Sequence, residues 1–161
     1  MKLLSLVCMV FTLCSATAEA DAVDQSRAAV ARMNVVLDSA GTAILPCGDE
    51  RIIAVLEVLD TLRDGLIQLQ ATAHNPNAPD YTRYLAEQKF IPIKAITIDA
   101  FFSAGLKLET AKCFDQADVI YRQVVESFPG MADAGYRDRA MLHIQDIRSQ
   151  RSRSISPPPH K

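Results

Sequence analysis

The sequence predicts an all-α protein built from antiparallel helical hairpins. Apolar residues recur every three or four positions in several segments, and turn-forming residues separate those segments. The stretch rich in β-branched residues, 90–98, contains Pro92 and has no second strand candidate to pair with. An apolar content of 49% over 161 residues is enough for the core of one domain. We expect about six helices.

Residues 1–20 have the composition of a secretory signal peptide. Lys2 supplies the positive charge, residues 3–13 form a short apolar run, and Ala-Glu-Ala at 18–20 is a small-x-small cleavage pattern. The apolar run is shorter than the roughly 20 residues that span a bilayer. We therefore expect an exported chain starting at Asp21, without a transmembrane segment, periplasmic if the source is bacterial and otherwise secreted.

A helical domain is expected over 21–150. Outside the repeat described below, helices are predicted at 22–38, 49–72, 80–89 and 132–150. Helix 49–72 has the clearest pattern, because Asp49 can cap it and its apolar residues form one stripe. We take 90–98 as the start of the next helix, since Pro92 suits a first turn. The loop 39–48 has an apolar centre and is expected to press onto the core.

The last eleven residues, 151–161, predict a disordered tail. They contain Arg151, Arg153, Lys161 and three consecutive prolines, with no acidic residue. A solvated terminus is the plainer interpretation, although the charge also allows weak contact with acidic surfaces. The whole chain has a net charge of −2, which does not favour nucleic acid as a partner.

Segment 98–131 has the residue spacing of a two-helix repeat. It follows the template W-x2-L-G-x2-Y, then A-x3-F, then P, with Phe in place of Trp, Ala in place of Leu and Leu in place of Tyr. It therefore resembles a tetratricopeptide repeat, and an ordinary helical hairpin is the alternative. The residues that would pack the repeat are Phe101, Gly105, Leu108, Phe114, Ala117, Tyr121 and Pro129. Gly105 and Ala117 are small where two helices must cross closely. The predicted helix 132–150 would cap the end of the stack.

The resemblance implies a binding groove along the first helix of the repeat. The groove-facing positions would be Asp99, Phe102, Leu106 and Glu109. This set lacks the Lys and Asn with which some family members hold a peptide's terminal carboxylate, so that ligand class is not expected. In the alternative interpretation, Phe102 and Leu106 pack against the predicted helix that contains residues 81–85.

Two cysteines, Cys47 and Cys113, remain after signal cleavage. We expect them to form a disulfide, because exported chains commonly fold in an oxidising compartment. A loop of 66 residues closed in this way would stabilise the fold by roughly 4 kcal/mol. Two buried free thiols are the alternative.

The remaining polar residues do not predict a catalytic or metal site. The three histidines share no ligand spacing, and the sequence contains no zinc-protease, nucleophile-elbow or phosphate-loop motif. No metal or cofactor is therefore expected.

The leading hypothesis is an exported interaction module that binds another protein or peptide, as an adaptor or assembly factor of the cell envelope. The alternatives are a small helical bundle that binds a ligand or unfolded client, and a hydrolase with an unrecognised site. An open apolar groove would favour the first, an enclosed cavity the second, and a cleft with perturbed titratable groups the third.

Overall fold

The computed structural model describes residues 17–128 and 133–155, which form five helices and no strand. The helices are α1 (Thr17–Asp38), α2 (Glu50–Ala73), α3 (Asp80–Thr110), α4 (Phe114–Ser127) and α5 (Ala134–Ile155). The predicted all-α class is confirmed. Within the described part of the chain, none of the helices is both long and apolar enough to cross a membrane.

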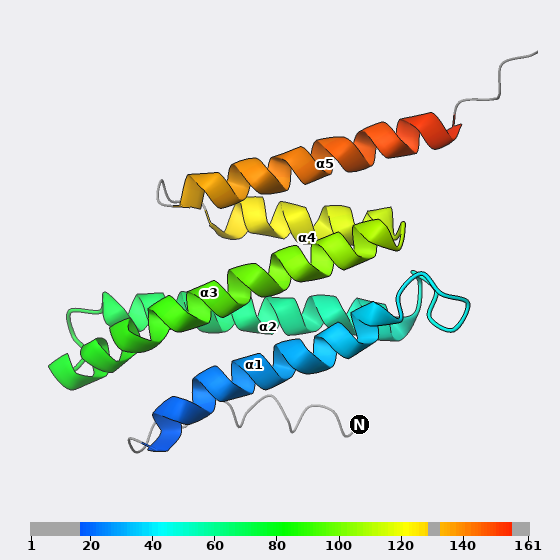
Figure 1. Cartoon of the computed structure of the whole chain (residues 1–161). Helices are drawn as coiled ribbons and strands as arrows, with labels where there is room; N and C mark the ends of the chain where they lie inside the picture. Colours follow the sequence, from blue (N-terminus) through cyan, green and yellow to red (C-terminus); the bar gives the residue numbers. More distant parts are fainter. Residues whose placement is uncertain (1–16, 129–132, 156–161) are drawn as a thin grey trace, which may run out of the picture.

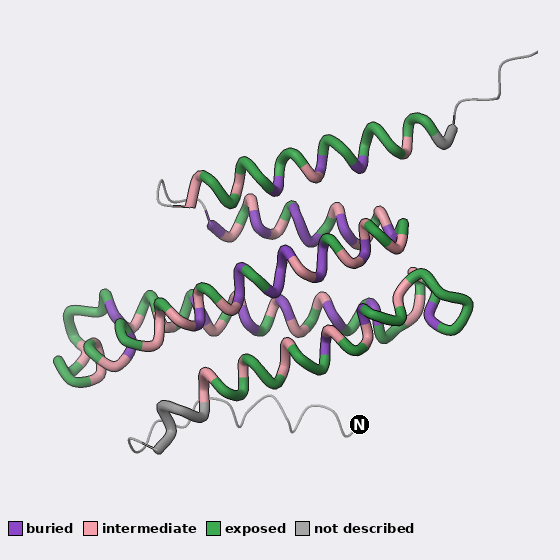
Figure 2. The backbone as a smooth tube through the Cα atoms, viewed as in Figure 1, coloured by how far each residue is buried: buried purple, intermediate pink, exposed green. Residues whose placement is uncertain are grey.

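In Figure 1, α1, α3 and α5 run in the same direction, and α2 and α4 run back between them. Helix α3 is the central helix, because it packs against α1, α2 and α4, while α5 packs against α4 at the other end of the array. The pairs Asn34–Ser103 and Asp38–Lys107 both join residues that are 69 apart in sequence, so α1 and α3 are parallel and in register. The buried residues, purple in Figure 2, are concentrated along the middle of α3 and on the helices that pack against it.

The long helix α3 corrects the predicted helix count. The segment 80–89 and the repeat helix expected to begin near 90 are one continuous helix, with Pro92 inside it. Proline cannot donate to the carbonyl of Gln88, but Gln88 is exposed, so water can satisfy that oxygen. Ile93 and Ile98, which both follow the proline, are buried in the core. Burial of this face stabilises the helix despite the lost hydrogen bond. Residues 17–128 and 133–155 therefore contain five helices instead of about six.

Helix α2 follows its sequence pattern closely. The Asp49 side chain caps the helix by accepting a hydrogen bond from the Arg51 backbone N–H at 2.9 Å. The apolar stripe supplies the buried residues Ile52, Val55, Leu59, Leu62 and Leu66.

Helix α5 extends beyond its predicted end, which corrects the boundary of the tail. It continues to Ile155, so the first five residues of the expected disordered segment are helical. Arg151 contributes by pairing with Asp115 of α4 at 2.6 Å. Residues 156–161 lie outside the described residues, as do residues 1–16 of the expected signal peptide and Pro129 of the repeat. Helix α1 begins at Thr17, so the expected cleavage site falls within its first turns.

The loop between α1 and α2 is tied to the turn between α3 and α4. Cys47 and Cys113 form a disulfide with a Cα–Cα distance of 5.2 Å, which confirms the predicted bridge. The Gln116 side chain donates a hydrogen bond to the Cys47 carbonyl at 2.8 Å. Leu45 is only 1% exposed, so the loop does press onto the core.

Gly41 allows the same loop to approach α3. Its φ of +73° lies in the left-handed region, and a Cβ at this position would lie 2.7 Å from the carbonyl oxygen of Ala111. A larger residue would therefore be strained in conformation and would also clash with the end of α3.

The C-terminus of α3 has a Schellman motif. Lys112 adopts a φ of 62°, its N–H donates to the Glu109 carbonyl at 2.9 Å, and the Cys113 N–H donates to the Leu108 carbonyl at 2.8 Å. This turn directs the chain into α4 and holds Cys113 beside the loop that carries Cys47.

Candidate functional site

An open cleft lies between the parallel helices α1 and α3. Its volume is about 400 Å³. We call it the α1–α3 cleft, and its lining residues are Arg27, Val30, Ala31, Asn34, Ile96, Asp99, Ala100 and Ser103. Most of its surface is apolar, and it is open to solvent rather than enclosed.

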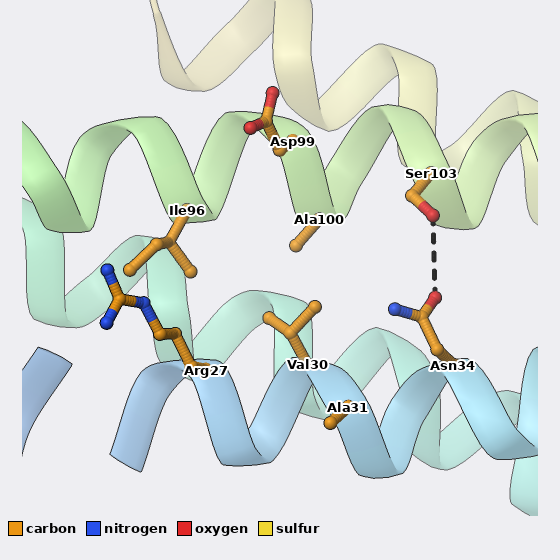
Figure 3. Close-up of a pocket in the computed structure, with 8 residues that line it drawn as sticks. All are labelled: Arg27, Val30, Ala31, Asn34, Ile96, Asp99, Ala100 and Ser103. Carbon is orange, nitrogen blue, oxygen red and sulfur yellow. Dashed lines mark hydrogen bonds between the residues drawn. The ribbon is translucent and has the colours of Figure 1, made fainter. Parts of the chain in front are cut away.

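The two ends of the α1–α3 cleft differ (Figure 3). At one end the Ser103 hydroxyl donates to the Asn34 side-chain oxygen at 3.4 Å, which joins the two helices. At the other end stands the Arg27 side chain, near Ile96, and the Asp99 carboxylate points away from α1. The cleft is therefore an apolar trough with polar groups at its ends.

The spacing of α1 and α3 is set near the C-terminus of α1. Beyond the Asn34–Ser103 hydrogen bond, the Lys107 ammonium pairs with Asp38. Just beyond this pair, Gly41 approaches Ala111 at the end of α3, and the disulfide ties the same loop to the turn before α4. These contacts fix the distance between α1 and α3 at the end of the cleft where Asn34 and Ser103 are hydrogen-bonded.

A group of aromatic and charged side chains, which we call the aromatic cluster, joins α3, α4 and α5. Its members are Phe102 and Glu109 of α3, Tyr121 of α4, and Tyr136, Arg139 and His143 of α5. The Tyr121 and His143 rings stack with their centroids 4.5 Å apart and their planes 9° apart. The centroid of the Phe102 ring lies 6.2 Å from that of Tyr121 and 6.4 Å from that of Tyr136.

One carboxylate connects the polar groups of the aromatic cluster. The Tyr121 hydroxyl donates to Glu109 Oε2 at 3.2 Å, and His143 Nδ1 lies 2.9 Å from the same oxygen. Burial raises the pKa of the Tyr121 phenol well above its ordinary value, and the charge of Glu109 raises it further. Tyr121 is 0% exposed, so its hydroxyl cannot reach a substrate. We interpret these contacts as structural.

The four predicted groove residues do not share one environment. Asp99 is exposed and lies at the α1–α3 cleft, whereas Phe102 is only 7% exposed because α5 covers it. Leu106 is 50% exposed, and Glu109 is engaged by Tyr121 and His143. The expected alternative neighbour of Phe102 is also different, because Tyr81 points to solvent with 65% exposure. Binding by these four residues remains a prediction.

The repeat-packing residues lie at the crossing of α3 and α4. Phe101, Leu108, Ala117 and Tyr121 are all 0% exposed. A Cβ on Gly105 would lie 2.7 Å from two carbons of the Tyr121 ring, so glycine permits this close approach. Phe114 is partly buried against the core. This packing agrees with the spacing of the template, and the tetratricopeptide resemblance itself remains a prediction.

Gly105→Ala is expected to lower the free energy of unfolding by about 1–3 kcal/mol through overpacking. The Tyr121 ring cannot easily retreat, because His143 stacks on it. Gly135→Ala is the control, since a Cβ there would meet nothing within 4 Å, and it should raise stability by up to about 1 kcal/mol. Urea denaturation measures both variants. Equal stabilisation by the two substitutions would contradict the close crossing.

Sequence reasoning did not identify the α1 side of the cleft. The apolar pattern of the predicted helix 22–38 does not show which helix lies opposite Val30. Within 17–128 and 133–155, no group of three or more His, Cys, Asp or Glu side chains is arranged to hold a metal ion.

No protein-family model, curated protein or solved structure matches the chain. We therefore infer the function from the geometry of the α1–α3 cleft and the aromatic cluster.

Proposed function

We propose that the protein is an exported interaction module that binds a segment of another protein in the α1–α3 cleft, as an adaptor or assembly factor of the cell envelope. The observation that carries this proposal is the open, mostly apolar cleft between two helices held in parallel register. An elongated trough of this kind suits a helical or extended peptide segment, which can place successive apolar side chains along it.

The two alternative functions have less support. A volume of about 400 Å³ is within the range of small-molecule sites, but an open cleft would leave much of a small ligand in water. A hydrolase would need reactive groups that a substrate can reach. The perturbed phenol of Tyr121 is fully buried, and its partner Glu109 is already occupied.

The disulfide supports the export part of the proposal. Disulfides form and persist mainly in oxidising compartments, and Cys47 and Cys113 are bridged. Together with the signal-like sequence of residues 1–20, this favours a location outside the cytosol.

Ala31 and Ala28 allow a matched test of the α1–α3 cleft. Both are exposed on α1, but Ala31 lines the cleft and Ala28 does not. A photo-crosslinking residue introduced at position 31 should capture a defined partner in the native host, and the same residue at position 28 should not. Once that partner is purified, Ala31→Arg should weaken its binding by at least about tenfold in calorimetry, because the long charged side chain fills an apolar site.

Ala28→Arg is the control for charge and helix stability, and it should bind like the wild type. The proposal fails if position 31 captures nothing in cells that express the protein at its normal level. It also fails if both arginine variants bind the captured partner as tightly as the wild type.

A further inference from the structure

We infer that the Arg139 guanidinium binds the carboxylate of an acidic side chain in the partner segment. This inference rests on the proposed function and adds the chemical class of the partner: an acidic peptide segment that also carries apolar residues. The site lies on the α5 side of α3, where Phe102, Tyr136 and Arg139 meet. It adjoins the α1–α3 cleft across α3, because Ser103 of the cleft directly follows Phe102.

The Arg139 guanidinium contacts the Phe102 ring but has no acidic partner among the described residues. The central carbon of its guanidinium lies 4.4 Å from the centroid of the Phe102 ring. Arg139 is exposed, and its guanidinium makes no hydrogen bond or ion pair with the residues that the structure describes. Contact with the ring holds the guanidinium near Phe102 and leaves its N–H donors available to a ligand. A carboxylate can accept two of these donors at once.

Three other cations on α3 and α5 are already paired with acidic side chains. Lys94 pairs with Asp133 at 2.5 Å, and Lys107 pairs with Asp38. Farther along α5, Arg151 pairs with Asp115. Arg139 differs from these three residues in having no acidic partner among the described residues, which is why we assign the ligand carboxylate to it.

The surroundings of Arg139 resemble the centre of a protein interface. Tyr136 precedes it by one helical turn and is 41% exposed, and His143 follows by one turn. On α3, Leu106 is 50% exposed and lies one turn after Phe102. Tyrosine and arginine are the residue types over-represented where interfaces concentrate their binding energy. An acidic side chain next to an apolar one would match Arg139 together with the exposed part of the Tyr136 ring one turn away.

Long-range electrostatic attraction would not by itself give a preference for acidic ligands at this surface. Asp99 and Asp138 are exposed close to Phe102 and Arg139 in sequence, and the whole chain has a net charge of −2. The two carboxylates and the net negative charge oppose long-range attraction of an anion, so we expect recognition to depend on direct contact with Arg139. For this reason a single substitution should remove the preference for acidic ligands.

The test uses a displayed library of random dodecapeptides, selected in parallel on the wild type, Arg139→Gln and Arg148→Gln. Arg148 is an exposed arginine on the same helix and controls for general charge. Peptides selected on the wild type and on Arg148→Gln should share an aspartate or glutamate at a fixed distance from apolar residues. That acidic position should be lost in the selection on Arg139→Gln.

Calorimetry on one selected peptide makes the test quantitative. Changing its acid to the amide should weaken binding to the wild type by about tenfold, with little further effect on Arg139→Gln. Arg139→Lys should bind the acidic peptide with intermediate affinity, because it keeps the charge but not the planar pair of donors. Thermal melts confirm that the variants are folded.

The inference is overturned if the selected peptides carry no acid, or if the acid persists on Arg139→Gln. It is also overturned if Arg139 is needed to bind vesicles of anionic phospholipid but not peptides. These outcomes are separable from failure of the proposed function, which is judged by the crosslinking at position 31 and the Ala31→Arg variant. A partner that binds the α1–α3 cleft and is indifferent to Arg139→Gln would refute this inference alone.

Discussion

Replacing both Cys47 and Cys113 by alanine is expected to lower the free energy of unfolding by about 4 kcal/mol. The bridge joins residues that are 66 apart in sequence, so it removes a large loop-closure entropy from the unfolded chain. It also holds the loop after α1 against the turn between α3 and α4, where Gln116 binds the Cys47 carbonyl. Urea denaturation of the oxidised wild type and the double variant measures the difference.

Reduced wild-type protein is the control for this prediction, and it should unfold near the double variant. Hydrogen exchange should show the largest change in the loop 39–49, because the disulfide is the covalent tie that holds it. A double variant that unfolds at the same urea concentration and with the same slope as the oxidised wild type would show that the bridge does not constrain the chain.

Phe102→Ala is expected to cost about 3–5 kcal/mol, the range for removing a buried phenylalanine. The ring is 7% exposed, contacts Tyr121 and Tyr136, and supports the Arg139 guanidinium. Its removal would leave a cavity where α3, α4 and α5 meet. Thermal and urea denaturation should both show the loss.

Leu106→Ala is the matched control for Phe102→Ala. Leu106 lies one turn later on α3 and is 50% exposed, so its truncation should cost less than about 1 kcal/mol. If the two variants were equally stable, α5 would not cover Phe102 in solution. Phe102 would then line the open groove that the repeat resemblance implies.

Several features were determined by the sequence. Helical periodicity was sufficient for the all-α class, because the spacing of apolar residues depends only on the geometry of the helix. Asp49 and the stripe of α2 located that helix for the same local reason. The disulfide could be paired in advance, since the expected signal cleavage leaves two cysteines. The small residue at Gly105 also indicated a close crossing, which is a local requirement.

The tertiary structure decided the remaining features. Pro92 predicts the start of a helix when only local hydrogen bonding is considered, but the burial of Ile93 and Ile98 keeps α3 continuous. Phe102 lies on a face that the sequence assigns equally well to a groove or to a core, and the path of α5 decided for the core. The α1–α3 cleft depends on contacts between residues 69 apart in sequence. Periodicity shows which face of a helix is apolar, but the neighbour of that face is decided only when the helices pack.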